Sequence, residues 1–353
     1  MWKKHPKALP FLFFSEMWER FGYYLMIGIF TLYLKDVKTG YAMTEAESAD
    51  LYGTFIALVF LTPFIGGLLA DRYLGYRKSI IMGGLMMGAG YCLMSVHSLP
   101  MLYISMTLVI LGNGFFKPNI STLLGNVYTT PQYVKQKDDG YNIFYMGINI
   151  GAFICNFFGA ALYIVYGWGA AFIAAGVGMF LGVIIFLSGT RHYKAFDVKK
   201  GVGENDMSMT RIVATIFVPS IAAGILGWLI PGNLVGSDST DAFLFACLPV
   251  IYFYASLFFR ATKDEKRPIA ALLAIFAVVV MFWAVFKQNG SALNTWADRY
   301  TNRQVTGIAQ TVFEKLNFSQ TITYTKDSVA KYDDQFRLQK ENGKIVKELN
   351  YPV

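Results

Sequence analysis

Long apolar segments recur along the first 300 residues of this chain. A helix that crosses a bilayer needs about 20 predominantly apolar residues. Of the 353 residues, 55% are hydrophobic and 15% are charged, whereas a soluble domain carries about 25% charged residues. The chain is therefore predicted to be an all-α, polytopic membrane protein. Its helices are expected at residues 10–34, 51–71, 79–97, 100–124, 141–165, 169–188, 211–230, 243–260 and 268–296.

Lysine and arginine residues collect in alternate loops between these helices. With the N-terminus inside the cell, the inner loops hold Lys3, Lys4, Lys7, Arg72, Arg77, Lys78, Lys135, Lys137, Arg191, Lys194, Lys199, Lys200, Arg211, Arg260, Lys263, Lys266 and Arg267. The outer loops before residue 297 hold only Lys35 and Lys38. Because cytoplasmic loops are enriched in these residues, we expect a multi-pass protein of the cell (inner) membrane with a cytoplasmic N-terminus. The net charge of +8 reflects this orientation, and no nucleic-acid partner is expected.

The helices and loops divide the chain into five parts. These are an N-terminal six-helix bundle at 1–190, a cytoplasmic linker at 191–210, an inserted hairpin at 211–260, a further helix at 268–299 and an extracytoplasmic loop at 300–353. The hairpin is almost free of internal charge, so we expect it to face lipid. Pro268 is expected in the first turn of its helix, and Thr321-Ile322-Thr323-Tyr324-Thr325 favours a β-strand.

The first apolar segment contains the charged cluster Glu16, Glu19 and Arg20. An ionised side chain at membrane depth costs at least ~2.5–3.5 kcal/mol, so such a cluster is a candidate functional site. Helical spacing places Arg20 one turn from Glu16 and from Tyr24, and Glu19 one turn from Tyr23. A structural ion pair that locks the helix in the bundle is the simpler interpretation. Two carboxylates beside one arginine favour a proton-carrying role, because one of them can hold a proton.

The motif Glu16-Met17-Trp18-Glu19-Arg20-Phe21-Gly22-Tyr23-Tyr24 resembles the first-helix motif of the proton-dependent oligopeptide transporter family, within the major facilitator superfamily. Residues 66–78 resemble the superfamily loop between helices 2 and 3. Residues 115–119, 144–151 and 282–288 resemble further family signatures, and so does the hairpin at 211–260. The resemblance extends from residue 1 to about residue 300. It implies a major facilitator fold of two six-helix bundles, of which this chain carries the first bundle and the start of the second.

The resemblance implies proton-coupled symport of di- and tripeptides by alternating access, driven by the proton gradient without a cofactor or metal. Small peptides, protons and the lipid bilayer are the expected partners, and protein partners are not predicted. The implied proton-coupling residues are Glu16, Glu19, Arg20 and Lys117. The implied substrate-binding residues are Arg20, Tyr23, Tyr24, Phe60, Lys117, Asn149, Trp283, Lys287 and Gln288, and Asp71, Arg72 and Arg77 belong to a gating loop. Lys117 is expected to pair with the first-helix carboxylates when the site is empty.

Several of these residues have simpler interpretations. Lys117 is also consistent with a lysine that extends to the membrane interface, Asn149 with a hydrogen bond between helices, and Trp283 with packing. Cys92, Cys155 and Cys247 fall within predicted helices at unrelated spacings, so we expect them to be small packing residues. His5, His97 and His192 lie at helix ends or in loops and are not expected to bind a ligand.

Three positions depart from the family pattern. Ile27 replaces a second arginine, Lys287 replaces a glutamate on the seventh core helix, and Phe60 replaces a tyrosine. Since that arginine and glutamate are thought to pair in the outer gate, we expect this gate to close without a salt bridge. Proton coupling then depends more heavily on Glu16, Glu19 and Lys117.

Two other functions remain open from the sequence. The same departures fit a relative that carries another small substrate, such as an amino acid conjugate or an anion. The chain ends at Val353 without a tenth apolar helix, so a truncated, non-transporting membrane fragment is the second alternative. An enzyme is disfavoured because neither HExxH nor GxSxG occurs on a predicted helix.

Overall fold

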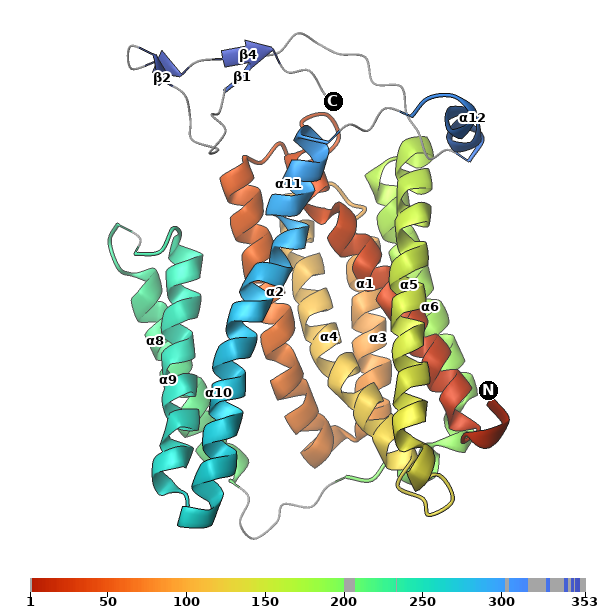
Figure 1. Cartoon of the computed structure of the whole chain (residues 1–353), viewed down its shortest axis with the longest axis vertical. Helices are drawn as coiled ribbons and strands as arrows, with labels where there is room; N and C mark the ends of the chain where they lie inside the picture. The colour runs from red at the N-terminus through yellow and green to blue at the C-terminus, as the bar shows by residue number, and fades with distance from the viewer. Residues whose placement is uncertain are drawn as a thin grey trace. The chain divides into compact units, whose positions relative to one another are not determined.

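The computed structural model describes residues 2–199, 207–232, 234–301 and 305–316, together with four short strands after residue 327. Each of the expected helices is present (Figure 1). The helices are α1 Ala8–Lys35, α2 Glu45–Leu69, α3 Tyr76–Leu93, α4 Leu99–Val127, α5 Lys137–Tyr166, α6 Trp168–Ser188, α7 Met209–Ile212, α8 Val218–Trp228, α9 Asp238–Arg260, α10 Lys263–Phe286, α11 Ala292–Arg299 and α12 Ile308–Lys315. A π turn at Val213–Phe217 joins α7 to α8, so the first arm of the hairpin is continuous.

The chain divides into two compact units, Met1–Lys287 and Gln288–Val353. The second unit holds α11, α12 and two small antiparallel sheets. In one sheet β1 (Ser328–Ala330) pairs with β4 (Lys347–Leu349), and in the other β2 (Lys340–Glu341) pairs with β3 (Lys344–Ile345). The predicted strand at 321–325 lies outside the described residues.

Helix α1 packs against both α5 and α6 in the first unit (Figure 1). This approach depends on small residues. A Cβ on Gly22 would lie 2.8 Å from the carbonyl oxygen of Ala175 on α6, and one on Gly151 of α5 would overlap the carbonyl oxygen of Met17. Such small residues let membrane helices approach closely. The charged segment of α1 is consequently enclosed by neighbouring helices.

Seven described segments are long and apolar enough to cross a membrane by length and composition. They are Glu45–Leu74, Leu99–Val127, Val134–Tyr166, Trp168–Ser188, Met209–Trp228, Asp238–Arg260 and Lys263–Ala297. α1 is not among them, and it contains the three charged residues of the cluster, which are buried inside the bundle. The protein is therefore a multi-pass membrane protein whose first helix places charge in the protein interior.

Most of the helices begin earlier than the hydrophobic pattern predicts, and two of them, α2 and α10, begin with a capping box. At the start of each of these two helices, a threonine side chain accepts a hydrogen bond from the backbone amide three residues later. The glutamate at that later position accepts a hydrogen bond from the backbone amide of the threonine. The pairs are Thr44 with Glu47 and Thr262 with Glu265. These capping boxes satisfy backbone donors of the first turn. The expectation that Pro268 lies in the first turn of its helix is therefore wrong, because the box starts α10 at Lys263.

The end of the same helix also differs from the prediction. α10 stops at Phe286, and a 3₁₀ turn at Lys287–Gly290 separates it from α11. The expected single helix at 268–296 is thus two helices. This break places Lys287 in the first compact unit and Gln288 in the second.

The inserted hairpin of α7, α8 and α9 is fastened to α2. The carboxylate of Asp50 on α2 accepts hydrogen bonds from the hydroxyls of Ser237 and Ser239, the latter at 2.5 Å. The rings of Phe64 and Phe217 approach with centroids 6.0 Å apart. Many other large apolar side chains of the hairpin are exposed, as a lipid-facing hairpin requires. They include Ile221, Ile225, Leu226, Leu248, Ile251, Tyr252 and Phe259.

Candidate functional site

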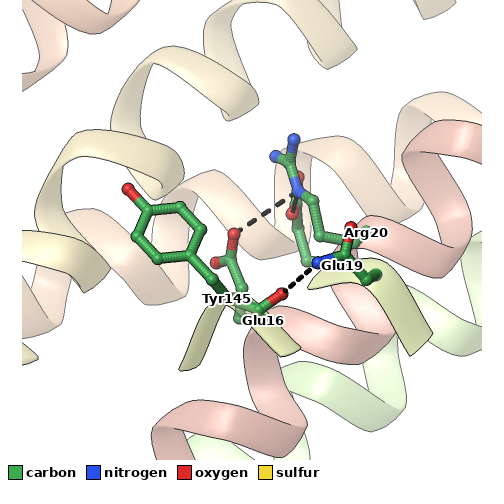
Figure 2. A network of polar contacts seen from close by, with 5 residues as sticks. Glu16, Glu19, Arg20 and Tyr145 are labelled. Carbon is green, nitrogen blue, oxygen red and sulfur yellow. Dashed lines mark hydrogen bonds and ion pairs between the residues drawn. The ribbon is translucent and has the colours of Figure 1, made fainter. Parts of the chain in front are cut away.

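Glu16, Glu19 and Arg20 lie fully inside the bundle, with at most 3% of each residue exposed. Figure 2 shows the arginine side chain between the two carboxylates. Arg20 Nη2 donates to Glu19 Oε1 at 2.5 Å, and Arg20 Nε donates to the other oxygen of Glu19. The Nε atom also lies 3.4 Å from Glu16 Oε1. Glu19 therefore has the two-pronged contact that a guanidinium makes best, and Glu16 has one longer contact.

The second oxygen of Glu16 is the unusual atom of this cluster. Glu16 Oε2 is buried and has no hydrogen-bond partner among the described residues. If both carboxylates are ionised, Arg20 balances only one of their two charges, and the nearby Lys117 makes no ion pair with either carboxylate. A buried charge without its own ion-pair partner is strongly unfavourable. A proton on Glu16 removes that charge and supplies a donor. The arrangement can thus hold and release one proton.

Tyrosine side chains surround the same guanidinium. Arg20 Cζ lies 4.9 Å from the ring centroid of Tyr23 and 6.0 Å from that of Tyr24, within the range of a cation–π contact. The hydroxyl groups of Tyr23 and of Tyr91, on α3, are both buried, and neither has a hydrogen-bond partner among the residues that the structure describes. The sequence analysis did not identify Tyr91, because an isolated tyrosine in an apolar helix gives no signal. Nor did it single out Tyr145, which is drawn with the cluster in Figure 2.

A second group of predicted residues meets around Phe60 of α2. The ammonium nitrogen of Lys117, on α4, lies 5.1 Å from the Phe60 ring centroid, and that of Lys287 lies 4.5 Å from it. Lys287 also lies 5.2 Å from the ring centroid of Trp283, whose own ring is 6.0 Å from Phe60. Four residues from three helical segments thus form one cluster, which we call the Phe60 cluster.

The structure does not bring Lys117 into an ion pair with the α1 carboxylates. In the described part of the chain, both ion pairs of this region are made by Arg20. Lys117 remains within electrostatic reach of Glu16, Glu19, Arg20 and Lys287. Its side chain is half-buried, and its ammonium nitrogen lies on the Phe60 ring.

Two other predicted residues make hydrogen bonds within their own segments. Asn149 is exposed on α5, and its amide donates to the Tyr145 carbonyl oxygen of its own helix at 3.1 Å. Gln288 belongs to the second compact unit, where its carbonyl oxygen accepts from the Ser291 amide at 3.2 Å. The sequence left open a hydrogen bond from Asn149 to another helix. The amide nitrogen of Asn149 donates within its own helix instead.

The predicted gating loop is tied to the linker that follows α6. The Tyr76 hydroxyl donates to Asp71 at 2.7 Å, and Arg72 donates to the Met207 carbonyl oxygen at 2.8 Å. Asp197 of the linker accepts from the backbone amides of Tyr76 at 2.7 Å and Arg77 at 3.2 Å. A carboxylate at the N-terminus of α3 is stabilised by the helix dipole. These contacts support a bracing role for the loop.

No described group of three or more His, Cys, Asp and Glu residues could hold a metal ion. The three cysteines are free, and Cys155 is buried. The chemistry that the two clusters offer is consequently that of carboxylates, cations and phenols: proton exchange and the binding of anionic groups.

Comparison with known proteins adds independent findings. A profile described as the POT family matches residues 77–319. An uncharacterized transporter, YclF of Bacillus subtilis, is 33% identical over 328 residues, which cover 89% of this chain and 65% of the relative. The di-/tripeptide transporter of Lactococcus lactis subsp. lactis is 28% identical, over 84% of this chain and 62% of the relative. The chain thus spans less than two thirds of the length of these relatives.

A solved structure of a peptide transporter has a similar fold. The crystal structure of a mutant of the peptide transporter POT in complex with alafosfalin is 30% identical to this chain, with a TM-score of 0.71. The match covers 88% of this chain and 64% of that one. These proteins are transporters, and their helical membrane fold is the one predicted from the sequence.

Proposed function

This chain belongs to the POT family, and on that premise we propose that it takes part in proton-coupled uptake of di- and tripeptides by alternating access. The observation that carries the proposal is the buried cluster in which Arg20 faces two carboxylates and Glu16 keeps one oxygen without a partner. A transporter that couples to protons needs such a group, because its charge must change during the cycle.

Protonation of Glu16 would change what Arg20 attracts. With both carboxylates ionised, the guanidinium is fully engaged by Glu19 and Glu16. Once Glu16 is neutral, its attraction for Arg20 falls, and a peptide carboxylate can take its place beside the guanidinium. Binding of proton and peptide would then favour each other, as coupled sites require.

The groups shared by all short peptides suit this part of the molecule. Every peptide has a terminal carboxylate, and Arg20 and Lys117 supply cations for it. Tyr23, Tyr24 and Asn149 supply uncharged polar groups and aromatic surface. Because these contacts ignore peptide side chains, a broad range of peptides can bind. In transporters, substrates bind near the bilayer midplane between helical repeats.

Uptake into vesicles tests the proposal. With a pH gradient imposed, wild-type protein is expected to accumulate a labelled alanyl dipeptide, and Arg20→Ala and Lys117→Ala are expected to abolish accumulation. Lys266→Ala is a matched control, because Lys266 also lies over an aromatic ring, that of Phe258 at 5.6 Å, and belongs to the start of α10 and to neither cluster. Unchanged accumulation in either site variant would refute the assigned roles.

A different small substrate is the second candidate. It is favoured by the Phe60 cluster, which brings two lysines to one ring. Competition of the labelled dipeptide with unlabelled dipeptides, nitrate and single amino acids distinguishes the two. Competition by nitrate or amino acids alone would favour the second candidate.

A further inference from the structure

The ring of Phe60 holds two ammonium groups that come from different parts of the sequence. Lys117 Nζ lies 5.1 Å and Lys287 Nζ 4.5 Å from its centroid. A cation–π contact stabilises a cation without neutralising it. The ring therefore supplies neither ammonium group with an opposite charge.

Within the described residues, neither lysine has a carboxylate partner. The nearby Arg20 is already engaged by Glu19 and Glu16. Like charges in a partly buried site repel each other, and Lys117, Lys287 and Arg20 all affect one another in this way. The region thus holds three cations and two carboxylates, an excess of one positive charge. A bound anion would relieve the repulsion.

The Phe60 cluster is also accessible. Phe60 is 44% exposed and Trp283 41% exposed, so the two rings present open surface next to the ammonium groups. Lysine side chains with three donors each can turn toward an incoming group. A carboxylate placed between the two nitrogens could accept from both.

We propose that the Phe60 cluster is a second anion subsite, which binds the acidic side chain of a peptide whose terminal carboxylate is held by Arg20 and Lys117. The inference rests on the proposed function and makes it more specific: the preferred substrates are peptides that contain Asp or Glu. Lys287 is the residue that sets this preference, and Phe60 and Trp283 position its ammonium group.

Binding of matched dipeptides to the purified full chain measures this preference. Alanyl-glutamate and alanyl-glutamine have nearly the same shape and differ in one negative charge. A charge-assisted hydrogen bond is expected to make alanyl-glutamate bind about tenfold more tightly at low salt. Titration calorimetry gives both dissociation constants, and inorganic sulfate serves as a probe for binding of a free anion.

Variants assign the effect to Lys287. Lys287→Gln is expected to bring the ratio of the two dissociation constants close to one, and Lys287→Arg is expected to retain the preference because it keeps the charge. Lys266→Gln is the control. Lys266 lies in the first turns of α10, also on one aromatic ring, and about 30 Å along the helix axis from the end of α10 that precedes Lys287. It is expected to leave the ratio at its wild-type value.

The outcomes separate this inference from the proposed function. If alanyl-glutamine binds and the wild-type ratio is near one, the subsite does not exist, although the peptide function stands. A ratio that survives Lys287→Gln also overturns the inference. If sulfate binds as tightly as alanyl-glutamate, the cluster serves free anions and its assignment to peptide side chains fails. If neither peptide binds, the proposed function fails and this inference fails with it.

Discussion

Glu16→Gln and Glu19→Gln are expected to have very different effects on stability, although both remove one carboxylate from the same cluster. Glu19 makes two contacts with Arg20, whereas Glu16 makes one at 3.4 Å and leaves its second oxygen without a partner. Loss of Glu19 breaks the main ion pair of a fully buried arginine. Breaking a buried pair costs about 3–5 kcal/mol, so Glu19→Gln should lower the free energy of unfolding by about that amount.

For Glu16→Gln, by contrast, we expect almost no change in the free energy of unfolding. At an effective dielectric constant of about 20, attraction between unit charges at the 3.4 Å separation of Glu16 and Arg20 is worth about 5 kcal/mol. Repulsion from Glu19 and the cost of burying the charge offset this attraction. Glutamine keeps the shape and removes the uncompensated charge, so the free energy of unfolding should change by less than about 1 kcal/mol.

Reversible unfolding by SDS in mixed micelles measures both differences, with helix content followed by circular dichroism. The wild type and the two variants are compared at pH 7 under identical lipid and detergent ratios. The reasoning is refuted if Glu16→Gln destabilises the protein as much as Glu19→Gln, because the two carboxylates would then be equivalent partners of Arg20.

Three further predictions concern other parts of the molecule. Burial acts to raise the pKa of Asp36, but hydrogen bonds from Thr39 and Trp168 outweigh it and hold this pKa below its ordinary value. Asp36→Ala should therefore cost about 1 kcal/mol at neutral pH, and in acid titrations this difference should shrink as the pH falls through the lowered pKa. Lys287→Glu alone should not improve proton-driven uptake, and an improvement would contradict a gate that closes without a salt bridge. Reporter fusions should place residue 1 in the cytoplasm and the segment at 300–316 outside; the reverse pattern would overturn the predicted orientation.

The sequence was sufficient for the fold because apolar segments of membrane length carry a strong signal. The positions of α1 to α6 follow from that pattern, and the motif on α1 correctly indicated a buried charged cluster. The early starts of α2 and α10 were missed although Thr44 and Glu47, and Thr262 and Glu265, are visible in the sequence as capping boxes. A prediction from hydrophobicity alone starts a helix at its first apolar residues. The helical backbone instead starts at the capping residue, which can lie several polar residues earlier.

The Phe60 cluster could not have been assembled from the sequence. Its residues lie on α2, on α4 and at the end of α10, and only helix packing brings them together. Lys117 and Lys287 were identified singly, one as a partner for carboxylates and the other as a departure from a pattern. Their common contact with one ring is a tertiary feature. The same holds for Tyr91, whose unpaired hydroxyl is recognisable only in a packed bundle.

Transport by Glu16→Gln in vesicles tests the central claim most directly, namely that Glu16 carries the coupling proton. Two modes are compared in the same preparation: exchange of peptide across the membrane without a gradient, and accumulation driven by a pH gradient. The account predicts that exchange persists, because a neutral Glu16 frees Arg20 for peptide, and that accumulation is lost. Accumulation at the wild-type level by this variant would contradict the account.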